Sequence, residues 1–260
     1  MIFDKYVNGH RTLKDLSKEY GKSLNWLRDK ISKAKYEKKI IDANSLVIVA
    51  DATYFKRAYG YIVFRSPKLK KNLYFKMIQH ETIDEYLSGR VMLESKGITL
   101  SAIVLDGKPG IRKLFLDIPV QMCHFHQKQI IQRYLTSSPK LEAGIELRKI
   151  LTTLCTTDAK TFTRKLNSWH KKWDKFLKER TSNPSAGFWY YTHRGVRSAY
   201  RSLKTNLPYL FTYKNYPDLN IPNTTNSLDG CFGHLKPKLK IHRGLNSKLK
   251  RKIIEYILQN

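Results

Sequence analysis

Two aspartates follow apolar stretches that have the composition of buried strands. Residues 46–50 form a continuous apolar run rich in β-branched side chains, and Asp51 comes directly after it. Residues 98–105 form a second such stretch, and Asp106 follows it. Ligand sites of α/β sheets gather at strand ends, and a carboxylate held there needs a partner such as a metal ion. Carboxylate oxygens suit Mg²⁺ or Mn²⁺, so the two residues predict a metal-dependent site.

A third carboxylate is needed to complete such a site, and Asp229 is the best candidate. It lies in residues 223–230 (NTTNSLDG), where we expect Asn226 to cap a helix whose first turn contains Asp229. Asn226 and Asp229 also have capping-box spacing, and a single aspartate after a strand often only opens a turn. The segment after Asp229 is strongly basic, which favours a metal ligand beside bound nucleic acid. Two ions about 4 Å apart activate a water or hydroxyl and stabilise the leaving oxygen of a phosphodiester.

The charge of the chain points to a polyanionic partner. The 260 residues include 49 Lys+Arg and 21 Asp+Glu, which gives a formal net charge of +28. Nucleic acid is the first partner that such a charge attracts, and an anionic membrane face is the second. No apolar run approaches the ~20 residues of a spanning helix, so we expect no membrane partner. The three cysteines lie far apart, which fits a reducing compartment and a cytoplasmic location.

The N-terminal residues predict a helix-turn-helix. Thr12 and Ser23 are expected to cap two short helices that meet at Gly21. The outer side of the second helix would face a DNA groove. A plain helical hairpin packed on the main domain is the alternative. The polar residues expected on the DNA-facing side are Lys22, Asn25, Arg28 and Lys30.

Two further groups of basic residues are expected to contact phosphates. Arg197, Arg201 and Lys204 have i, i+4, i+7 spacing and share one helix face. An ordinary solvated face is the alternative, but opposing acids are scarce there. The second group follows Asp229 and consists of Lys236, Lys238 and Arg243.

The order of the predicted elements indicates an α/β fold. Three strands come first, and then a helix, a strand, a short helix and a last strand, before a mostly helical stretch over 127–215. Strands are expected at 46–50, 57–65, 72–79, 98–105 and 120–126, and helices at 82–96, 111–116, 127–135, 141–152, 159–178 and 196–207.

Four motifs in this order resemble the mutator-type transposases of bacterial insertion sequences. They are VIVADATYF, IVLDGKPG, CHFHQKQIIQRYLT and IPNTTNSLDGCFGHLKPKLKIHRGL, and they cover roughly residues 45–135 and 220–258. The resemblance implies a ribonuclease H-like mixed sheet, a large helical insertion and a Mg²⁺-dependent acidic triad. Mapped by motif, the triad is Asp51, Asp106 and Asp229. The segments expected are a helix-turn-helix at 1–40, a catalytic domain at 45–135 and 220–260, and the insertion at 136–219.

The chain departs from the family pattern at the third acid and at the N-terminus. The third acid is normally Glu, and Asp229 is one methylene shorter. Relatives often carry an N-terminal zinc ribbon, and this chain has no Cys-x-x-Cys. Cys123 and His126 match the family's Cys-x-x-His after the second acid. With His124 they offer three ligands where a structural zinc takes four, so we do not expect zinc here and expect a structural role near the site or contact with DNA.

The resemblance implies an Mg-dependent DNA transposase that cuts and joins phosphodiesters. Its partners would be double-stranded DNA with the terminal repeats of the element and the target DNA, bound by a homodimer or larger assembly at the bacterial nucleoid. One alternative is a catalytically decayed, sequence-specific DNA-binding protein, acting as a repressor or surviving as a relic. Another is a structure-specific nuclease of the same fold.

Overall fold

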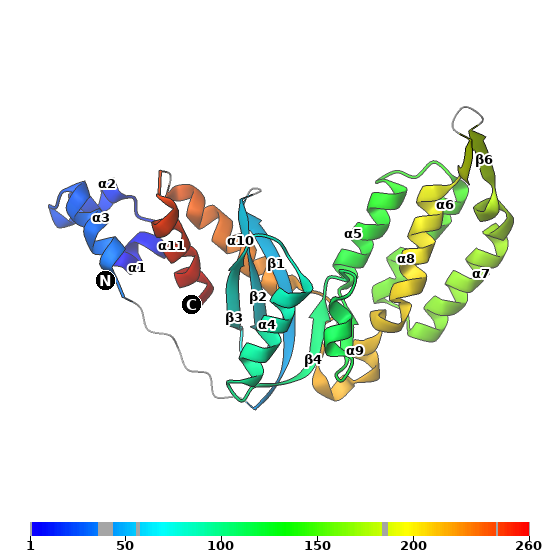
Figure 1. The fold of residues 1–260 in the computed structure, drawn as a ribbon, viewed down its shortest axis with the longest axis horizontal. Helices are drawn as coiled ribbons and strands as arrows, with labels where there is room; N and C mark the ends of the chain where they lie inside the picture. Colours follow the sequence, from blue (N-terminus) through cyan, green and yellow to red (C-terminus); the bar gives the residue numbers. More distant parts are fainter. Residues whose placement is uncertain (1, 36–43, 56–57, 184–186, 243, 260) are drawn as a thin grey trace. The chain divides into compact units, whose positions relative to one another are not determined.

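The computed structural model describes residues 2–35, 44–55, 58–183, 187–242 and 244–259 (Figure 1). Contacts divide the chain into two compact units. Unit 1 consists of Met1–Thr99 and Asn226–Asn260, and unit 2 consists of Leu100–Thr225. The fold is mixed α/β, with a five-stranded sheet of order β3-β2-β1-β4-β5.

Three antiparallel strands form the centre of unit 1. They are β1 (Ser45–Phe55), β2 (Tyr59–Ser66) and β3 (Lys71–Ile78). Successive side chains of a strand point to opposite faces. Because nearly all residues of β2 are buried, other elements must pack against both faces of this strand. Helix α4 (Ile83–Glu94) covers one face, where Phe64 lies 6.0 Å from Tyr86 between ring centroids.

The C-terminal helices cover the opposite face of these strands. They are α10 (Asn226–Ile241) and α11 (Ser247–Gln259). The Tyr61 hydroxyl of β2 donates to Glu255 of α11 at 3.4 Å. The Asn72 amide of β3 donates to the Leu258 carbonyl at 2.7 Å and lies 3.5 Å from Cys231 Sγ of α10.

Three short N-terminal helices pack on α11. They are α1 (Ile2–Val7), α2 (Leu13–Tyr20) and α3 (Leu24–Lys33). Thr12 caps α2 in a reciprocal capping box with Asp15, Gly21 ends it at φ 60°, and Ser23 caps α3. The expected helix starts are therefore confirmed, because the capping groups supply the partners that free helical N–H groups need. A buried cluster joins these helices to α11 through Phe3, Val7, Leu16, Leu27, Ile31 and Ile253.

Unit 2 is mostly helical around a second core. Buried Leu147, Phe162, Trp169 and Leu203 lie at its centre. Its strands are β4 (Thr99–Leu105, of which Thr99 belongs to unit 1), β5 (Val120–Met122), β6 (Arg180–Asn183) and β7 (Phe188–Tyr191). Its helices are α5 (His124–Leu135), α6 (Glu142–Thr152), α7 (Ala159–Lys178), α8 (Arg194–Leu210) and α9 (Thr212–Asn215), with 3₁₀ turns at Ile111–Phe115, Thr153–Cys155 and Pro217–Leu219.

Several expected elements differ from the observed ones. The first strand was expected to end before Asp51, but β1 continues to Phe55 because residues 51–55 pair with β2. The last strand was expected to reach His126, but β5 ends at Met122 and α5 begins at His124. The β6–β7 hairpin was not expected, and the start of the second predicted strand, Arg57, lies outside the described residues.

No helix in the described part of the chain combines the length and the apolar character needed to cross a membrane.

Gly89 provides a test of how tightly α4 packs on the sheet. A Cβ atom at this position would lie 2.4 Å from Cε2 of the buried Phe64 ring. We expect Gly89→Ala to lower the free energy of unfolding by about 1–3 kcal/mol, the usual cost of overpacking a core. Gly233 in α10 has nothing within 4 Å of such an atom. As the matched control, Gly233→Ala should raise stability by about 0.5–1 kcal/mol. Urea denaturation measures both, and equal stability of Gly89→Ala and wild type would contradict this packing.

A buried histidine predicts acid sensitivity of unit 1. His242 is 5% exposed, and its ring centroid lies 4.0 Å from that of Tyr6. Burial lowers the pKa of His242, and the nearby His10 lowers it further. The unfolded chain therefore binds more protons once the pH falls below about 6.5, so stability falls with acidification through that range. We expect His242→Phe to flatten the dependence of the urea midpoint on pH between neutral and mildly acidic conditions. An unchanged slope would show that this ring does not contribute.

Candidate metal and nucleic-acid site

Asp51 lies in the middle of β1, on the sheet face that the C-terminal helices cover. It pairs with Val63 in the antiparallel register, and Thr53 pairs with Tyr61. Paired residues share a face, and Tyr61 reaches Glu255 of α11 on that side. Asp51 is half-buried, and its Oδ1 accepts the Ala52 N–H at 2.7 Å. The expectation of a carboxylate at a strand end is therefore wrong for Asp51, although its side chain is held by a regular strand.

Asp229 lies in the first turn of α10, as its motif predicts, but Asn226 is the first residue of this helix and not the cap before it. This helix packs against β1 and β2, and its buried residues include Leu228 and Phe232. Asp229 itself is exposed. Asp51 thus points to the sheet face that α10 covers, and Asp229 occupies the first turn of that same helix. Unit 1 places the first and third acids on one side of its strands.

Asp106 comes directly after β4 in unit 2, as expected from the apolar stretch before it. It is half-buried, and its Oδ1 accepts the Lys108 N–H at 2.9 Å in the turn that follows. Gly107 in this turn has φ 92°, a backbone conformation that glycine adopts without strain. The turn therefore fixes the carboxylate at the end of the strand.

Arg112 is a residue of this site that the sequence did not indicate. Burial lowers the pKa of its guanidinium, whereas Tyr209 and Asp106 act in the opposite direction. The guanidinium donates to the Asn206 amide oxygen at 2.8 Å and lies 4.4 Å from the centroid of the Tyr209 ring. A half-buried cation therefore lies within electrostatic reach of Asp106.

The donor set of the three aspartates consists of carboxylate oxygens, which are the ligands that Mg²⁺ and Mn²⁺ prefer. Asp51 and Asp229 belong to unit 1, and Asp106 belongs to unit 2. Within the described ranges, no three His, Cys, Asp or Glu side chains form a ready-made metal cluster. The chemistry of the donors fits such an ion, and the triad stays a prediction.

Cys123 and His124 begin α5 and hold it inside unit 2. The Cys123 thiol is buried and accepts the Thr225 N–H at 3.3 Å. Burial alone would raise the pKa of this thiol, but hydrogen bonds with His126 and Thr225 lower it, and the net shift is downward. His124 Nε2 lies 2.6 Å from the Leu210 carbonyl, and its Nδ1 lies 3.5 Å from Cys155 Sγ. Through these contacts, Cys123 and His124 hold the start of α5 against Thr225 and Leu210.

The four polar residues predicted to face DNA are all exposed, with Lys22 just before α3 and the other three along it. Leu27 and Ile31 are fully buried on the inner side of α3. On the outer side, the Arg28 guanidinium donates to the Asn25 amide oxygen at 2.8 Å. Trp26 is 37% exposed, and two ammonium groups lie 5.9 and 5.5 Å from the centroid of its ring. These two groups belong to Lys22 and Lys30.

The basic stripe of α8 lines a pocket of about 380 Å³. Arg197, Arg201 and Lys204 lie along it, opposite His170 of α7. The His170 ring stacks on Tyr200 with a centroid distance of 4.3 Å and an interplanar angle of 15°. We call this the α7–α8 pocket. Three cationic side chains around one concave surface can bind a phosphate group.

Aromatic rings support the cations beside this pocket. The guanidinium groups of Arg197 and Arg180 lie 3.7 and 3.8 Å from the ring centroids of Tyr191 and Trp189 on β7. Trp189 is 49% exposed. In the sequence, the run of four aromatic residues in FWYY, a residue type favoured in strands, is a signal for the second strand of this hairpin.

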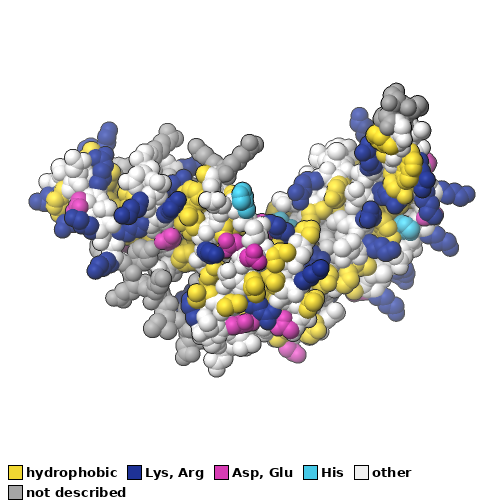
Figure 2. Space-filling view, in the orientation of Figure 1, with side chains coloured by type: hydrophobic (Ala, Val, Ile, Leu, Met, Phe, Trp, Pro, Cys, Tyr) yellow, Lys and Arg dark blue, Asp and Glu magenta, His cyan; other side chains and the backbone are white. Residues whose placement is uncertain are grey.

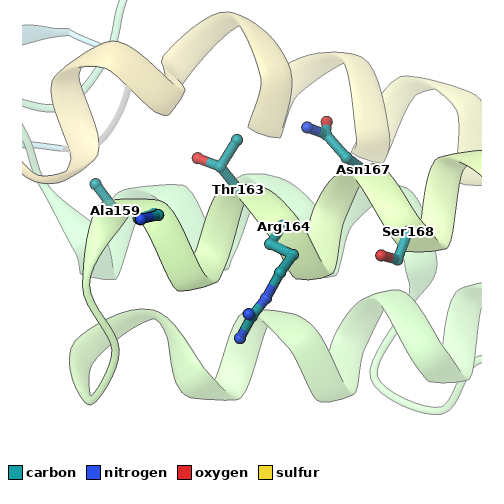
Figure 3. Close-up of a pocket in the computed structure, with 6 residues that line it drawn as sticks. Ala159, Thr163, Arg164, Asn167 and Ser168 are labelled. Carbon is teal, nitrogen blue, oxygen red and sulfur yellow. The ribbon is translucent and has the colours of Figure 1, made fainter.

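A larger hollow on α7, of about 540 Å³, has less chemical content. It is lined by residues of this helix alone, among them Lys160, Arg164 and Asn167. Figure 3 shows the labelled side chains projecting from one helix without converging on a common point. It is therefore a surface groove and carries no functional argument.

Of the three basic residues predicted after Asp229 to contact phosphates, the structure describes Lys236 and Lys238. Lys236 is exposed. The Lys238 ammonium donates to the Asn8 amide oxygen at 2.9 Å, so this cation already has a partner within unit 1. Arg243 lies outside the described residues.

Comparison with known proteins gives no assignment. No protein-family model matches the chain, and neither does any curated protein sequence.

The α7–α8 pocket predicts a defined contribution to the binding of a polyanion. We expect the double substitution Arg201→Ala, Lys204→Ala to weaken binding of a short DNA duplex and to reduce its salt slope by about 0.9 for each lost phosphate contact. Fluorescence anisotropy at several salt concentrations measures this slope. Lys68 and Lys96 are exposed lysines of unit 1, so Lys68→Ala, Lys96→Ala removes the same charge elsewhere. If the two double variants behave alike, the pocket is no specific contact.

Proposed function

We propose that this chain is a DNA transposase that resembles the mutator type of bacterial insertion sequences. It would cut and join phosphodiesters at element ends by metal-dependent hydrolysis and transesterification. The observation that carries the proposal is the placement of two triad residues. Asp51 points to the sheet face that α10 covers, and the family motif places Asp229 in the first turn of that helix.

The strand order supports a ribonuclease H-like sheet. An antiparallel meander, β3-β2-β1, is extended by β4 and β5, which are parallel to each other. In this proposal residues 1–40 form the DNA-reading helix-turn-helix, and residues 136–219 form the helical insertion. Residues 45–135 and 220–260 form the catalytic domain.

Asp51, Asp106 and Asp229 would hold Mg²⁺ or Mn²⁺. When bound, such ions activate the attacking water or 3′-hydroxyl and stabilise the leaving oxygen. The protein's own contribution is to hold the carboxylates and the substrate. The Gly107 turn fixes Asp106, the regular β1 strand fixes Asp51, and the α7–α8 pocket positions phosphates.

The outer side of α3 would read the terminal repeat. Its residues are polar and exposed, and the buried side of the helix is locked to α11 through Ile31 and Ile253. The partners are double-stranded DNA with terminal repeats and the target DNA. The protein would act as a homodimer or larger assembly at the nucleoid, in the bacterial cytoplasm.

A second candidate function is sequence-specific DNA binding without cleavage, as in a repressor or a relic. The exposed position of Asp229 and its shorter side chain favour this candidate. A structure-specific nuclease of the same fold is a third candidate, and it would cut branched DNA without preferring repeat ends.

Cleavage of a supercoiled plasmid with Mg²⁺ separates these functions. We expect Asp106→Asn to reduce nicking at least about a hundredfold, because a lost metal ligand removes several kcal/mol of transition-state stabilisation. Asp218 is an exposed aspartate of the same unit, so Asp218→Asn is the matched control and should cut like wild type. Identical background cleavage by wild type and Asp106→Asn would exclude the active enzyme.

The same assay with Asp229→Glu tests the third acid. An increase in cutting would show a catalytic site that the shorter side chain weakens. Absence of cutting by both forms, with specific DNA binding retained, would favour the repressor or relic.

A further inference from the structure

The β6–β7 hairpin presents large aromatic rings to solvent beside cationic side chains. Phe188 and Trp189 of β7 are 57% and 49% exposed, although both residue types are mostly buried in folded proteins. Figure 2 shows hydrophobic side chains next to Lys and Arg in the area where Figure 1 draws β6. A ligand for such a surface needs flat apolar faces as well as negative charge.

One face of the hairpin carries a continuous series of rings and guanidinium groups. Trp189 and Tyr191 alternate along β7 and share a face, and Arg180 of β6 pairs with Tyr191 in the antiparallel register. The Arg180 guanidinium lies 3.8 Å from the centroid of the Trp189 ring and 5.7 Å from that of Tyr191. Arg197 of α8 lies 3.7 Å from the same Tyr191 ring. We call these four residues the hairpin track.

The hairpin track leads into the α7–α8 pocket. Arg197 belongs to both, because it lines the pocket together with Arg201 and Lys204. From Arg197 to Lys204 the helix advances about 10 Å, at 1.5 Å per residue. The exposed rings and the cationic pocket are therefore two parts of one surface of unit 2.

The charge of this surface is positive throughout. Residues 180–205 contain five Lys and Arg and no Asp or Glu. Glu179 comes just before this stretch, and its Oε2 lies 2.8 Å from Nε2 of His193. Such a surface attracts a polyanion, and phosphates are the anions that clustered Arg and Lys side chains bind in nucleic acids.

The exposed rings distinguish unpaired nucleic acid from a duplex. Within a duplex the faces of the bases are covered by their neighbours, so only unpaired bases can stack on an aromatic side chain. A cationic groove that tracks the backbone, combined with rings on which bases stack, is how proteins bind single strands. The pocket supplies the first feature and Trp189 supplies the second.

We propose that the hairpin track and the α7–α8 pocket together bind an unpaired stretch of nucleic acid. A base stacks on Trp189, and Arg197, Arg201 and Lys204 hold the phosphates that follow. The Arg197 guanidinium also donates to the Leu177 carbonyl at 3.3 Å, which orients the group and leaves its other N–H groups for phosphate oxygens. The inference rests on the proposed function only in taking nucleic acid as the partner. It goes beyond that function, because stacking of unpaired bases needs no cleavage.

Tryptophan fluorescence during titration with a short oligothymidylate tests the stacking. We expect quenching in the wild type, because a base stacked on an indole ring quenches its emission. Trp189→Phe should abolish this quenching and keep most of the affinity, since a phenyl ring also stacks on bases. Trp26 is the matched control, because it is 37% exposed and has lysines nearby but belongs to unit 1. Trp26→Phe should retain the quenching.

Fluorescence anisotropy with the labelled oligothymidylate separates stacking from charge. Trp189→Ala should weaken binding at least about fivefold at every salt concentration, the lower end of what one stacked base contributes. Arg201→Ala, Lys204→Ala should instead reduce the salt slope by about 0.7 for each lost phosphate contact of a single strand. Tyr216 is 47% exposed elsewhere in unit 2, so Tyr216→Ala should leave the affinity unchanged. Equal thermal midpoints establish that the variants fold.

Three results would overturn the proposal. They are quenching that persists in Trp189→Phe, an affinity for oligothymidylate that Trp189→Ala does not weaken, or equal weakening by Trp189→Ala for a blunt duplex. Quenching of Trp189 by anionic lipid vesicles and not by oligothymidylate would also overturn it and indicate a membrane contact.

The outcomes separate this inference from the proposed function. A chain that binds oligothymidylate through Trp189 but never cleaves DNA would sustain the inference and not the transposase. A chain that cleaves DNA but fails these binding tests would do the reverse.

Discussion

The burial of both faces of β2 is the constraint on which the rest of unit 1 depends. Tyr61 and Val63 point to one face and Ile62 and Phe64 to the other, and all four are almost fully buried. One face is covered by α4, which follows the meander directly in the chain. The other face needs α10 and α11, which come after the whole of unit 2. This long-range cover places the first turn of α10, with Asp229, on the side to which Asp51 points.

The same C-terminal cover also stabilises the N-terminal helices. Ile253 of α11 belongs to the buried cluster of α1–α3, and Lys252 donates to the Ile31 carbonyl at 3.1 Å near the end of α3. A cation at a helix C-terminus interacts favourably with the helix dipole. A short three-helix module thus gains a core that it could not form alone, because small units bury too little apolar surface.

Aromatic rings of β7 lie against three arginines that form no ion pair with an acid in the described part of the chain. Arg180, Arg194 and Arg197 each lie within 4.3 Å of an aromatic ring centroid on β7. A guanidinium stacked on a ring keeps its N–H edges available for phosphate oxygens, whereas a salt bridge would occupy them. The net charge of +28 is therefore compatible with ordered side chains and with a surface that still binds anions.

Local signals in the sequence determined many of the elements, and long-range pairing decided the rest. The caps at Thr12 and Ser23, the extent of α7 and the place of Asp106 after β4 follow from contacts within a few residues, which the sequence displays directly. The extension of β1 past Asp51, the hairpin of Trp189 and the cation beside Asp106 depend on partners far away in the chain. The outer side of α4 belongs to the second group, because only the packed sheet shows which of its apolar residues remain exposed. Sequence periodicity reports the neighbours of a residue along its own helix or strand, but the face that becomes buried is decided by the elements that pack against it.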